Sequence, residues 1–480
     1  MLVKNTFYNL IGLGIPLLAA VVSIPMLITA LGADRFGLLT LIWAVVSYFG
    51  LFDLGLGRAM TQQLAVVFAN KDHERIGPLV ATATVLMAVL GVFAGVLMAA
   101  LAPWGVGLVH GVPNQQEAIN AVYALAFAMP AIVLTSGFRG ILEAKHAFGI
   151  VNLIRLPMGL FTFLGPLAVV IYGEPRLDWI AVVLAAGRIV ACIVHAWYAW
   201  RVLPRNHGSL TFHINLLQPL YISGGWMTVS NIISPFMGYV DRFIIGGIVS
   251  ASAVAYYTTP QELVTKLWII PGALTAVLFP TFAMQIAQRD EQTWVLFKKS
   301  IRWMFAVLLP VTMTLALFSQ ELLSLWINPE FASHSKLLLQ IFAVGVLINC
   351  MAHVPFTLIQ SAGIPRLTAL IHLAELPFFL GTLWWLTADY GVLGAAIAWL
   401  LRMVVDTILM FAVCNPLLER SAKALLNIKV FGMLLLGVIA FSGVLFEPIF
   451  ARVIWIVVLL CIAALSILLP KVLAMISSTR

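Results

Sequence analysis

The chain has 480 residues, of which 62% are hydrophobic and 10% are charged, with a formal net charge of +8. Because a soluble domain carries about 25% charged residues, this composition excludes a soluble globular protein. Apolar runs of about 18 residues or more recur along the chain and predict a polytopic membrane protein. The positive charge does not indicate a nucleic-acid partner, since in a membrane protein the distribution of Lys and Arg matters more than their sum.

Clusters of Gly, Pro and charged residues divide the chain into about fourteen predicted spans of roughly 20 residues each. In chain order the predicted spans cover 6–31, 36–57, 79–103, 117–138, 149–172, 178–200, 217–248, 253–283, 302–320, 335–360, 367–388, 391–414, 427–446 and 449–470. The polar connection over 201–215 is the best candidate linker between the sixth and seventh spans.

The seventh and eighth spans repeat the start of the chain. A shift of 218 positions brings residues 5–65 onto 223–283 without a gap. The matching positions are Leu31-Gly32 with Val249-Ser250, Gly37 with Ala255, Thr40 with Thr258 and Ala65 with Ala283. The repeat predicts two related halves.

We therefore expect an all-α polytopic membrane protein. It would have two pseudo-symmetric six-helix lobes around a central cavity, and two further helices at the C-terminus. The expected parts are an N-terminal lobe of residues 1–205 with spans 1–6, a C-terminal lobe of 206–415 with spans 7–12, and 416–480 with spans 13–14 and a cytoplasmic tail.

The distribution of Lys and Arg predicts the orientation. With the N-terminus inside, 19 of the 27 Lys and Arg residues fall on the cytoplasmic side, and both termini are cytoplasmic. The outer side receives Arg35, Arg176, Lys336 and Arg452. The expected location is the bacterial cytoplasmic (inner) membrane.

Nine charged residues remain deep inside the predicted spans. The bases are Arg188, Arg242, Lys266 and Arg402, and the acids are Asp53, Asp241, Glu262, Glu375 and Asp406. Each would cost about 2.5–3.5 kcal/mol at a lipid-facing helix centre, so we expect them to face a wet cavity or one another.

Helical spacing separates these charges into pairs and single groups. Glu262 with Lys266, and Arg402 with Asp406, are four residues apart, so each pair either neutralises itself or lines a cavity. Arg188 has no acid three or four residues away, which favours a functional cavity at that position. The adjacent residues Asp241 and Arg242 diverge by about 100° on a helix, which disfavours mutual pairing.

The chain also offers little for catalysis or metal binding. The four cysteines stand singly in apolar runs, at Cys192, Cys350, Cys414 and Cys461, and predict no disulfide or metal site. No nucleotide-binding loop, nucleophile elbow, zinc-protease motif or loop long enough for a catalytic domain is present. We therefore expect no enzymatic activity and no cofactor.

Short motifs mark the start of each half. The chain opens with Asn5-x-x-Tyr8, Leu31-Gly32-Ala33-x-x-Phe36-Gly37-Leu38 and Tyr48-x-x-Leu51-x-Asp53-Leu54-Gly55-Leu56. The second half carries Asp241-Arg242, Val254-Ala255-Tyr256-Tyr257, Pro271 and Pro280. These motifs resemble those of bacterial polysaccharide and O-antigen flippases, a branch of the multidrug/oligosaccharidyl-lipid/polysaccharide exporter superfamily. The resemblance covers the whole chain.

The resemblance implies a flippase for undecaprenyl-diphosphate-linked oligosaccharide, an O-antigen or exopolysaccharide repeat unit. It would move this substrate from the cytoplasmic to the outer leaflet by alternating access. The four buried bases would bind the diphosphate, and the five acids would line the cavity or couple transport to protons or sodium. Expected partners are the lipid-linked substrate, membrane lipid and polysaccharide polymerase machinery.

Three other functions compete with this interpretation. A cation-coupled multidrug or toxin extruder of the same superfamily would need an acidic cavity to bind organic cations. The near balance of four buried bases and five buried acids does not exclude this function. A polysaccharide polymerase or ligase would need a large outer loop, which this chain lacks. A lipid II flippase would place more bases in the first two spans.

Overall fold

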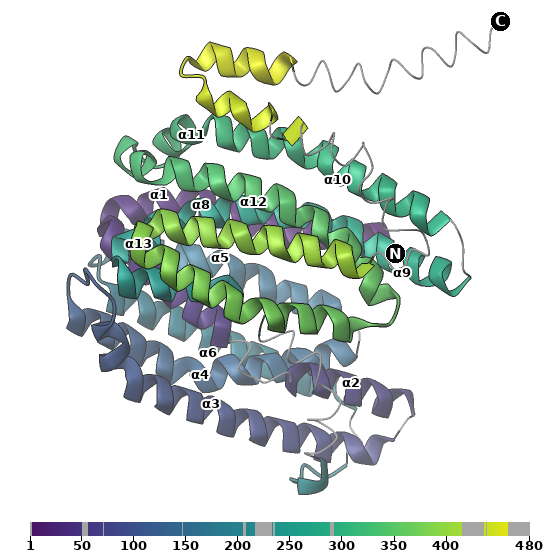
Figure 1. Cartoon of the computed structure of the whole chain (residues 1–480). Helices are drawn as coiled ribbons and strands as arrows, with labels where there is room; N and C mark the ends of the chain where they lie inside the picture. Colours follow the sequence, from purple (N-terminus) through teal and green to yellow (C-terminus); the bar gives the residue numbers. More distant parts are fainter. Residues whose placement is uncertain are drawn as a thin grey trace, which may run out of the picture. The chain divides into compact units, whose positions relative to one another are not determined.

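The computed structural model describes residues 2–49, 56–70, 72–145, 147–204, 208–216, 233, 236–288, 292–414, 436–437 and 439–458 (Figure 1). Every regular element within these residues is a helix. Eight of the described helices are long and apolar enough to cross a membrane, or nine when one bent pair counts as a single span. The predicted all-α polytopic fold class is therefore confirmed, and the count of about fourteen spans stays a prediction.

The chain forms two compact units. Unit 1 comprises Met1–Thr258 and Leu383–Val392, and unit 2 comprises Thr259–Thr382 and Leu393–Arg480. The division between them falls within helix α8 (Ala251–Thr265), and also within α13 (Pro365–Cys414), whose middle part 383–392 belongs to unit 1. The expected lobes of 1–205 and 206–415, with the C-terminal part 416–480, stay a prediction.

Unit 1 is built around helix α4 (Gln115–Ala144), which packs against α2, α3 and α6. Asn114 caps its first turn, because its side-chain oxygen accepts a 3.1 Å hydrogen bond from the backbone N–H of Glu117. The other elements of unit 1 are α1 (Leu2–Phe49), α2 (Leu56–Ala69), η1 (His73–Arg75), α3 (Ile76–Gly107), α5 (Phe148–Tyr172), α6 (Leu177–Val202), η2 (Ile214–Leu216) and a helix over 236–248.

Helix α1 contains two membrane lengths. Its 48 residues would extend about 72 Å, more than twice the hydrocarbon thickness of a bilayer. Gly32, with φ of 76°, breaks the helix in a backbone conformation that glycine adopts easily. The break coincides with the predicted gap between spans 6–31 and 36–57. Helix α13 (Pro365–Cys414) is interrupted in the same way at Gly391, the first residue of the predicted span 391–414.

Unit 2 is built around helix α12 (Pro329–Ser361), which packs against α9, α10 and α11. Asn328 caps it by accepting a 2.7 Å hydrogen bond from Phe331, and Pro329 occupies the first helical turn. The other elements are η3 (Lys266–Trp268), α9 (Ile269–Ala287), α10 (Gln292–Leu317), α11 (Ser319–Trp326), α13 without its residues 383–392, and η6 (Gly443–Leu445).

Three helices depart from the predicted spans. The predicted span 253–283 is interrupted, because α8 gives way to a 3₁₀ turn over Lys266–Trp268 before α9 begins. Pro271 explains the interruption, since it lacks an N–H and its ring clashes with the carbonyl four residues earlier. Helix α2 extends to Ala69, beyond the predicted end at 57, and α10 begins at Gln292 rather than 302.

The last two predicted spans are described only over 436–437 and 439–458. In this hairpin, Trp455 and Ala440 pack on Met313 and Leu317 of α10. Arg452 joins the same contact, because its Nη1 donates to the Glu321 carboxylate at 2.9 Å and to the carbonyl of Leu317 at 2.9 Å. The hairpin is thereby attached to the α10–α11 end of unit 2.

Candidate functional site

Arg188 is a base on α6 with a half-buried side chain. Within the described residues, its guanidinium makes no hydrogen bond or ion pair. Cys192, one turn further along α6, bonds to Thr135 of α4, so Arg188 lies on the α6 face directed toward α4. A base inside a membrane span without a protein partner needs water or an anion. Arg188 therefore meets the requirement for an anion-binding group.

His195 lies two turns beyond Arg188 on the same face of α6. Its Nδ1 lies 2.8 Å from the carbonyl oxygen of Ala191, and because that oxygen can only accept, Nδ1–H is the donor. The positive charge of Arg139 on α4 acts on the imidazole of His195. Arg139 also forms an ion pair with Glu143, with 3.5 Å between Nε and the carboxylate oxygen. The hydrogen bond of His195 therefore lies within α6 and joins no second helix.

Asp241 and Arg242 are both buried in the helix over 236–248, with exposed fractions of 0% and 5%. The Tyr257 hydroxyl donates a 2.8 Å hydrogen bond to Oδ2 of Asp241. The guanidinium of Arg242 lies over the ring of Tyr239, 5.0 Å from its centroid, in a cation–π contact. These two predicted site residues therefore lie in the packed interior of unit 1.

Glu262 and Lys266 form an ion pair across one helical turn, with 2.7 Å between the carboxylate oxygen and Nζ. Their side chains are 36% and 43% exposed, respectively. Of the two roles that the spacing allows, self-neutralisation is the one that this geometry supports.

Unit 2 brings three predicted site residues of α13 together with residues of α12. Asp406 Oδ2 accepts a 3.1 Å hydrogen bond from Asn349, and Asp406 Oδ1 lies 3.6 Å from Nε2 of His372. The charge of Asp406 also interacts electrostatically with the imidazole of His353 on α12. We call this group, with Glu375 and Arg402, the α12–α13 polar cluster.

Glu375 is the most unusual member of the α12–α13 polar cluster. Its side chain is 3% exposed, and neither carboxyl oxygen has a hydrogen-bond partner in the described part of the chain. The charges of Asp406 and Arg402 act on its carboxyl group. Nδ1 of His372 is likewise buried without a hydrogen-bond partner. Arg402 lies over the Phe379 ring, 5.2 Å from the centroid. The cluster is thus a set of titratable groups with unused hydrogen-bonding capacity.

The nine predicted site residues are therefore distributed over several places. Arg188 and the Asp241-Arg242 pair lie in unit 1, and no described contact joins them. Unit 2 holds the Glu262–Lys266 pair, and Glu375, Arg402 and Asp406 in the polar cluster. Asp53 lies outside the described residues. The predicted roles of all nine stay predictions.

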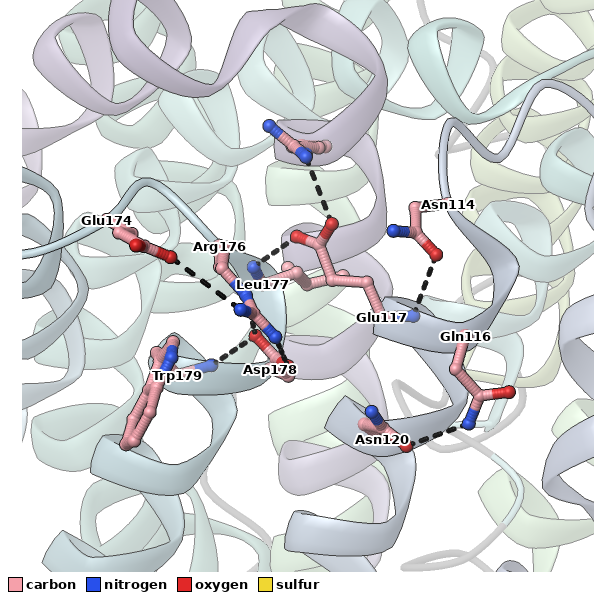
Figure 2. A network of polar contacts seen from close by, with 10 residues as sticks. Asn114, Gln116, Glu117, Asn120, Glu174, Arg176, Leu177, Asp178 and Trp179 are labelled. Carbon is pink, nitrogen blue, oxygen red and sulfur yellow. Dashed lines mark hydrogen bonds and ion pairs between the residues drawn. The ribbon is translucent and has the colours of Figure 1, made fainter.

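A polar network at the N-termini of α4 and α6 was not expected from the sequence (Figure 2). The carboxylate of Glu117 accepts a 2.6 Å hydrogen bond from the backbone N–H of Leu177 and a 3.0 Å bond from Arg35 of α1. Beside it, Arg176 pairs with Asp178 at 2.6 Å and with Glu174 at 3.6 Å. Glu117 is 82 positions from Arg35, so no local pattern indicates this contact.

Comparisons with known proteins place the chain among polysaccharide transport proteins. The profile of the family described as "Polysaccharide biosynthesis protein" matches residues 30–336. A "Putative O-antigen transporter" from Shigella flexneri is 33% identical over 414 residues, which cover 85% of this chain and 96% of that protein. A "Probable low-salt glycan biosynthesis flippase" from Haloferax volcanii is 22% identical over 246 residues, 49% of this chain and 52% of that protein.

A solved structure shares the fold. The inward-facing structure of a multidrug resistance MATE family transporter of the MOP superfamily aligns with a TM-score of 0.73 at 15% sequence identity, over 85% of this chain and 98% of that chain. At this identity the likeness concerns the fold alone. The profile match and the Shigella relative together show that this chain belongs to the polysaccharide biosynthesis protein family, the flippase family that its opening motifs resemble.

Proposed function

We propose that this protein is a flippase that moves undecaprenyl-diphosphate-linked oligosaccharide from the cytoplasmic to the outer leaflet by alternating access. The observation that carries the proposal is Arg188, a base inside a membrane span whose guanidinium has no partner among the described residues. A planar guanidinium matches phosphate oxygens in a bidentate geometry. The name of the Shigella relative supports an O-antigen or related glycan as the cargo.

The orientation follows from the distribution of Lys and Arg. We place both termini in the cytoplasm and the chain in the bacterial inner membrane, as the loop charges favour. The break at Gly32, the α3–α4 turn and the link around Ser250 then face outward. An anionic diphosphate moving outward descends the membrane potential by about 2.3 kcal/mol per charge per 100 mV. The empty site carries positive charge, so the inside-negative potential also favours its return to the cytoplasmic side.

The α12–α13 polar cluster is our candidate for ion coupling. An ionised carboxylate buried without a hydrogen bond is costly, so a cation bound to Glu375 would relieve a defined penalty. Two imidazoles, His353 and His372, lie near the same Asp406 charge. Either a proton or a sodium ion bound at this cluster would neutralise Glu375, and a comparison of the two gradients distinguishes them.

The experiment is flipping of a fluorescent undecaprenyl-diphosphate oligosaccharide in proteoliposomes. We expect Arg188→Ala to slow flipping about 10- to 100-fold, because a charge-assisted hydrogen bond contributes about 1.5–3 kcal/mol. Arg188→Lys should retain part of the activity, since the charge remains but the bidentate geometry is lost. Arg155→Ala removes an exposed base of α5 and serves as the matched control.

Two results would contradict the proposal. If the wild-type protein leaves the lipid-linked oligosaccharide in place and exports an organic cation against a proton gradient, it is an extruder and the buried acids form its site. If it flips the substrate and Arg188→Ala behaves like Arg155→Ala, the substrate assignment stands and the role of Arg188 is wrong.

A further inference from the structure

The connection after α6 has two unlike sides. Along its described residues 208–216, which we call the strap, polar side chains alternate with apolar ones: Ser209, Leu210, Thr211, Phe212, His213 and Ile214. The Thr211 hydroxyl lies 3.2 Å from the hydroxyl of Ser209 and 2.9 Å from Nε2 of His213, so hydrogen bonds draw the polar side chains to one side. The three apolar side chains between them are 48%, 49% and 70% exposed in chain order. The strap therefore has a bonded polar side and an uncovered apolar side.

The strap is attached to the start of α3 at two points. A Cβ atom added to Gly208 would collide with the carbonyl oxygen of Glu74, and the φ of 74° at Gly208 is one that glycine adopts easily. The backbone N–H of His213 donates a 3.0 Å hydrogen bond to the hydroxyl of Thr82. Glu74 and Thr82 are separated by about 12 Å of helix. The strap thus runs along the side of α3 and reaches a residue inside the predicted span 79–103.

Thr82 shows which side of α3 the strap covers. Helical spacing places Thr82 on the same face as Val85, Val89 and Val96. These three valines are exposed, whereas Thr82 is 0% exposed. An exposed stripe that is uniformly apolar, on a helix that crosses the membrane, faces lipid tails. The strap therefore lies over the end of the lipid-facing stripe of α3.

The elements next to the strap carry residues that are typical of the lipid headgroup layer. Helix α6, which leads into the strap, ends with exposed Trp197 and Trp200, and the guanidinium of Arg201 lies 4.0 Å from the ring centroid of Trp197. On η1, against which Gly208 packs, the side chain of Arg75 is exposed. Trp and basic residues concentrate where a membrane meets water. The strap thus begins at the level of the membrane–water interface.

We propose that the strap is a lipid-binding surface whose apolar side chains, Leu210, Phe212 and Ile214, insert into the leaflet at the start of α3. Gly208 and Thr82 hold the strap in this position. Lipid is the occupant that the structure favours, because the apolar side of the strap continues the lipid-facing stripe of α3 and its insertion removes apolar surface from water. This leaflet is the cytoplasmic one in the proposed orientation, and the proposal does not require the flippase function.

Spin labels test the insertion. We would replace the four native cysteines with alanine, place one cysteine at each position from 209 to 214 in turn, and attach a nitroxide in vesicles of phosphatidylethanolamine and phosphatidylglycerol. Collisions with oxygen increase with depth in a bilayer, and collisions with a water-soluble nickel chelate decrease. We expect the ratio of oxygen to nickel collisions to be about twofold higher, or more, at 210, 212 and 214 than at the three polar positions. Val89→Cys is the lipid reference, and Glu174→Cys, at a 73% exposed side chain, is the water reference.

A second measurement addresses the attachment to α3. Thr82→Val removes the hydroxyl that accepts from the strap, and Gly208→Val places a side chain against Glu74 in a backbone conformation that valine rarely adopts. Either change should reduce the alternation of the ratios by about half or more. Thr162→Val removes a hydroxyl that bonds within its own helix, and Gly363→Val strains a φ of 77° with no atom within 4 Å of the new Cβ. These two variants are the matched controls and should keep the alternation.

The outcomes judge the strap separately from transport. Neither measurement uses a transported substrate, so a wild-type protein that flips no oligosaccharide contradicts the proposed function and leaves the strap to be judged by its ratios. Ratios at 210, 212 and 214 that equal the value of Glu174→Cys would overturn the proposal and leave a protein partner as the occupant of this surface. Alternation that persists in both Thr82→Val and Gly208→Val would show that α3 does not hold the strap.

Discussion

The hydroxyl of Tyr257 donates a 2.8 Å hydrogen bond to Oδ2 of Asp241, and both side chains are completely buried. Tyr257 belongs to α8 and Asp241 to the helix over 236–248, so the bond joins the two helices on either side of the link at Ser250. A buried carboxylate depends on such donors, because it has lost its contacts with water. The pair thus fixes the geometry from which α8 approaches α1.

We predict that Tyr257→Phe destabilises the protein by about 1–2 kcal/mol, since Asp241 loses one donor in the membrane interior. The measurement is the thermal midpoint in a mild detergent. Tyr172→Phe is the control, because Tyr172 is 89% exposed and should give no change. If both variants unfold at the wild-type temperature, the Tyr257 hydroxyl contributes nothing to the packing of these helices.

The Glu117 network predicts a difference between two acids that are both labelled in Figure 2, Glu117 and Glu174. Glu117→Gln retains a single acceptor oxygen for the donors Arg35 and Leu177, so it should cost about 1–3 kcal/mol. Glu174→Gln removes only a 3.6 Å contact of a 73% exposed side chain and should have little effect on stability.

A double mutant tests whether the Glu117 effect arises from Arg35. The combined Arg35→Ala and Glu117→Gln changes should cost less than the two single changes added together, because both remove the same ion pair. Additive costs measured by thermal unfolding would show that the two side chains act independently.

Two helix breaks were predictable from the sequence, whereas the interruption at Lys266–Trp268 and the contacts between helices were not. Gly32 and Gly391 interrupt α1 and α13 where glycine and charged residues divide the apolar runs. The Glu262–Lys266 pair also follows from spacing, because helical geometry fixes which residues lie one turn apart. Contacts within one helix or at its ends need only local information.

The polar partners of Asp406 show why contacts between helices could not be predicted from the sequence. Asn349 is 57 positions away on α12, and its contact depends on the rotation of that helix about its axis. An apolar helix surrounded by lipid and protein has no strong amphipathic pattern that would reveal this rotation. For the same reason, the sequence identified Glu375 as an intramembrane acid but did not show that both of its oxygens are unpartnered.

The polar cluster gives a prediction about coupling. Glu375→Gln replaces the carboxyl with a neutral group that cannot exchange a proton. If protons couple to transport at this site, flipping driven by a pH gradient should lose its dependence on that gradient. The measurement compares initial flipping rates with and without a pH gradient at fixed membrane potential. Glu143→Gln, which changes a partly exposed acid of α4, is the control and should retain the dependence.

Two other results would contradict proton coupling at Glu375. If Glu375→Gln keeps the wild-type response to the pH gradient, Glu375 does not carry the coupling proton. If the wild type responds to a sodium gradient in place of a pH gradient, the coupling ion is sodium. In either case flipping itself, and with it the proposed function, remains separately measurable.

The contacts of Arg452 indicate how the C-terminal hairpin is attached to α10 and α11. Its Nε donates to the carbonyl of Phe446 at 2.6 Å, and its Nη1 donates to Glu321 and to the carbonyl of Leu317. The Leu317 carbonyl belongs to the last turn of α10, where no helical N–H is available to it. A single side chain thus supplies donors to the hairpin's own backbone, to a helix end and to a carboxylate.

We expect Arg452→Ala to speed hydrogen exchange of the backbone amides in 439–458, because the hairpin then keeps only its apolar contacts with α10. Arg452→Lys should restore little, since one ammonium group cannot reproduce the directions of the guanidinium donors. Lys336→Ala, a change at an exposed base of α12, is the control. Exchange that accelerates equally throughout α12 would show global destabilisation, whereas acceleration confined to 439–458 identifies Arg452 as the attachment of this hairpin.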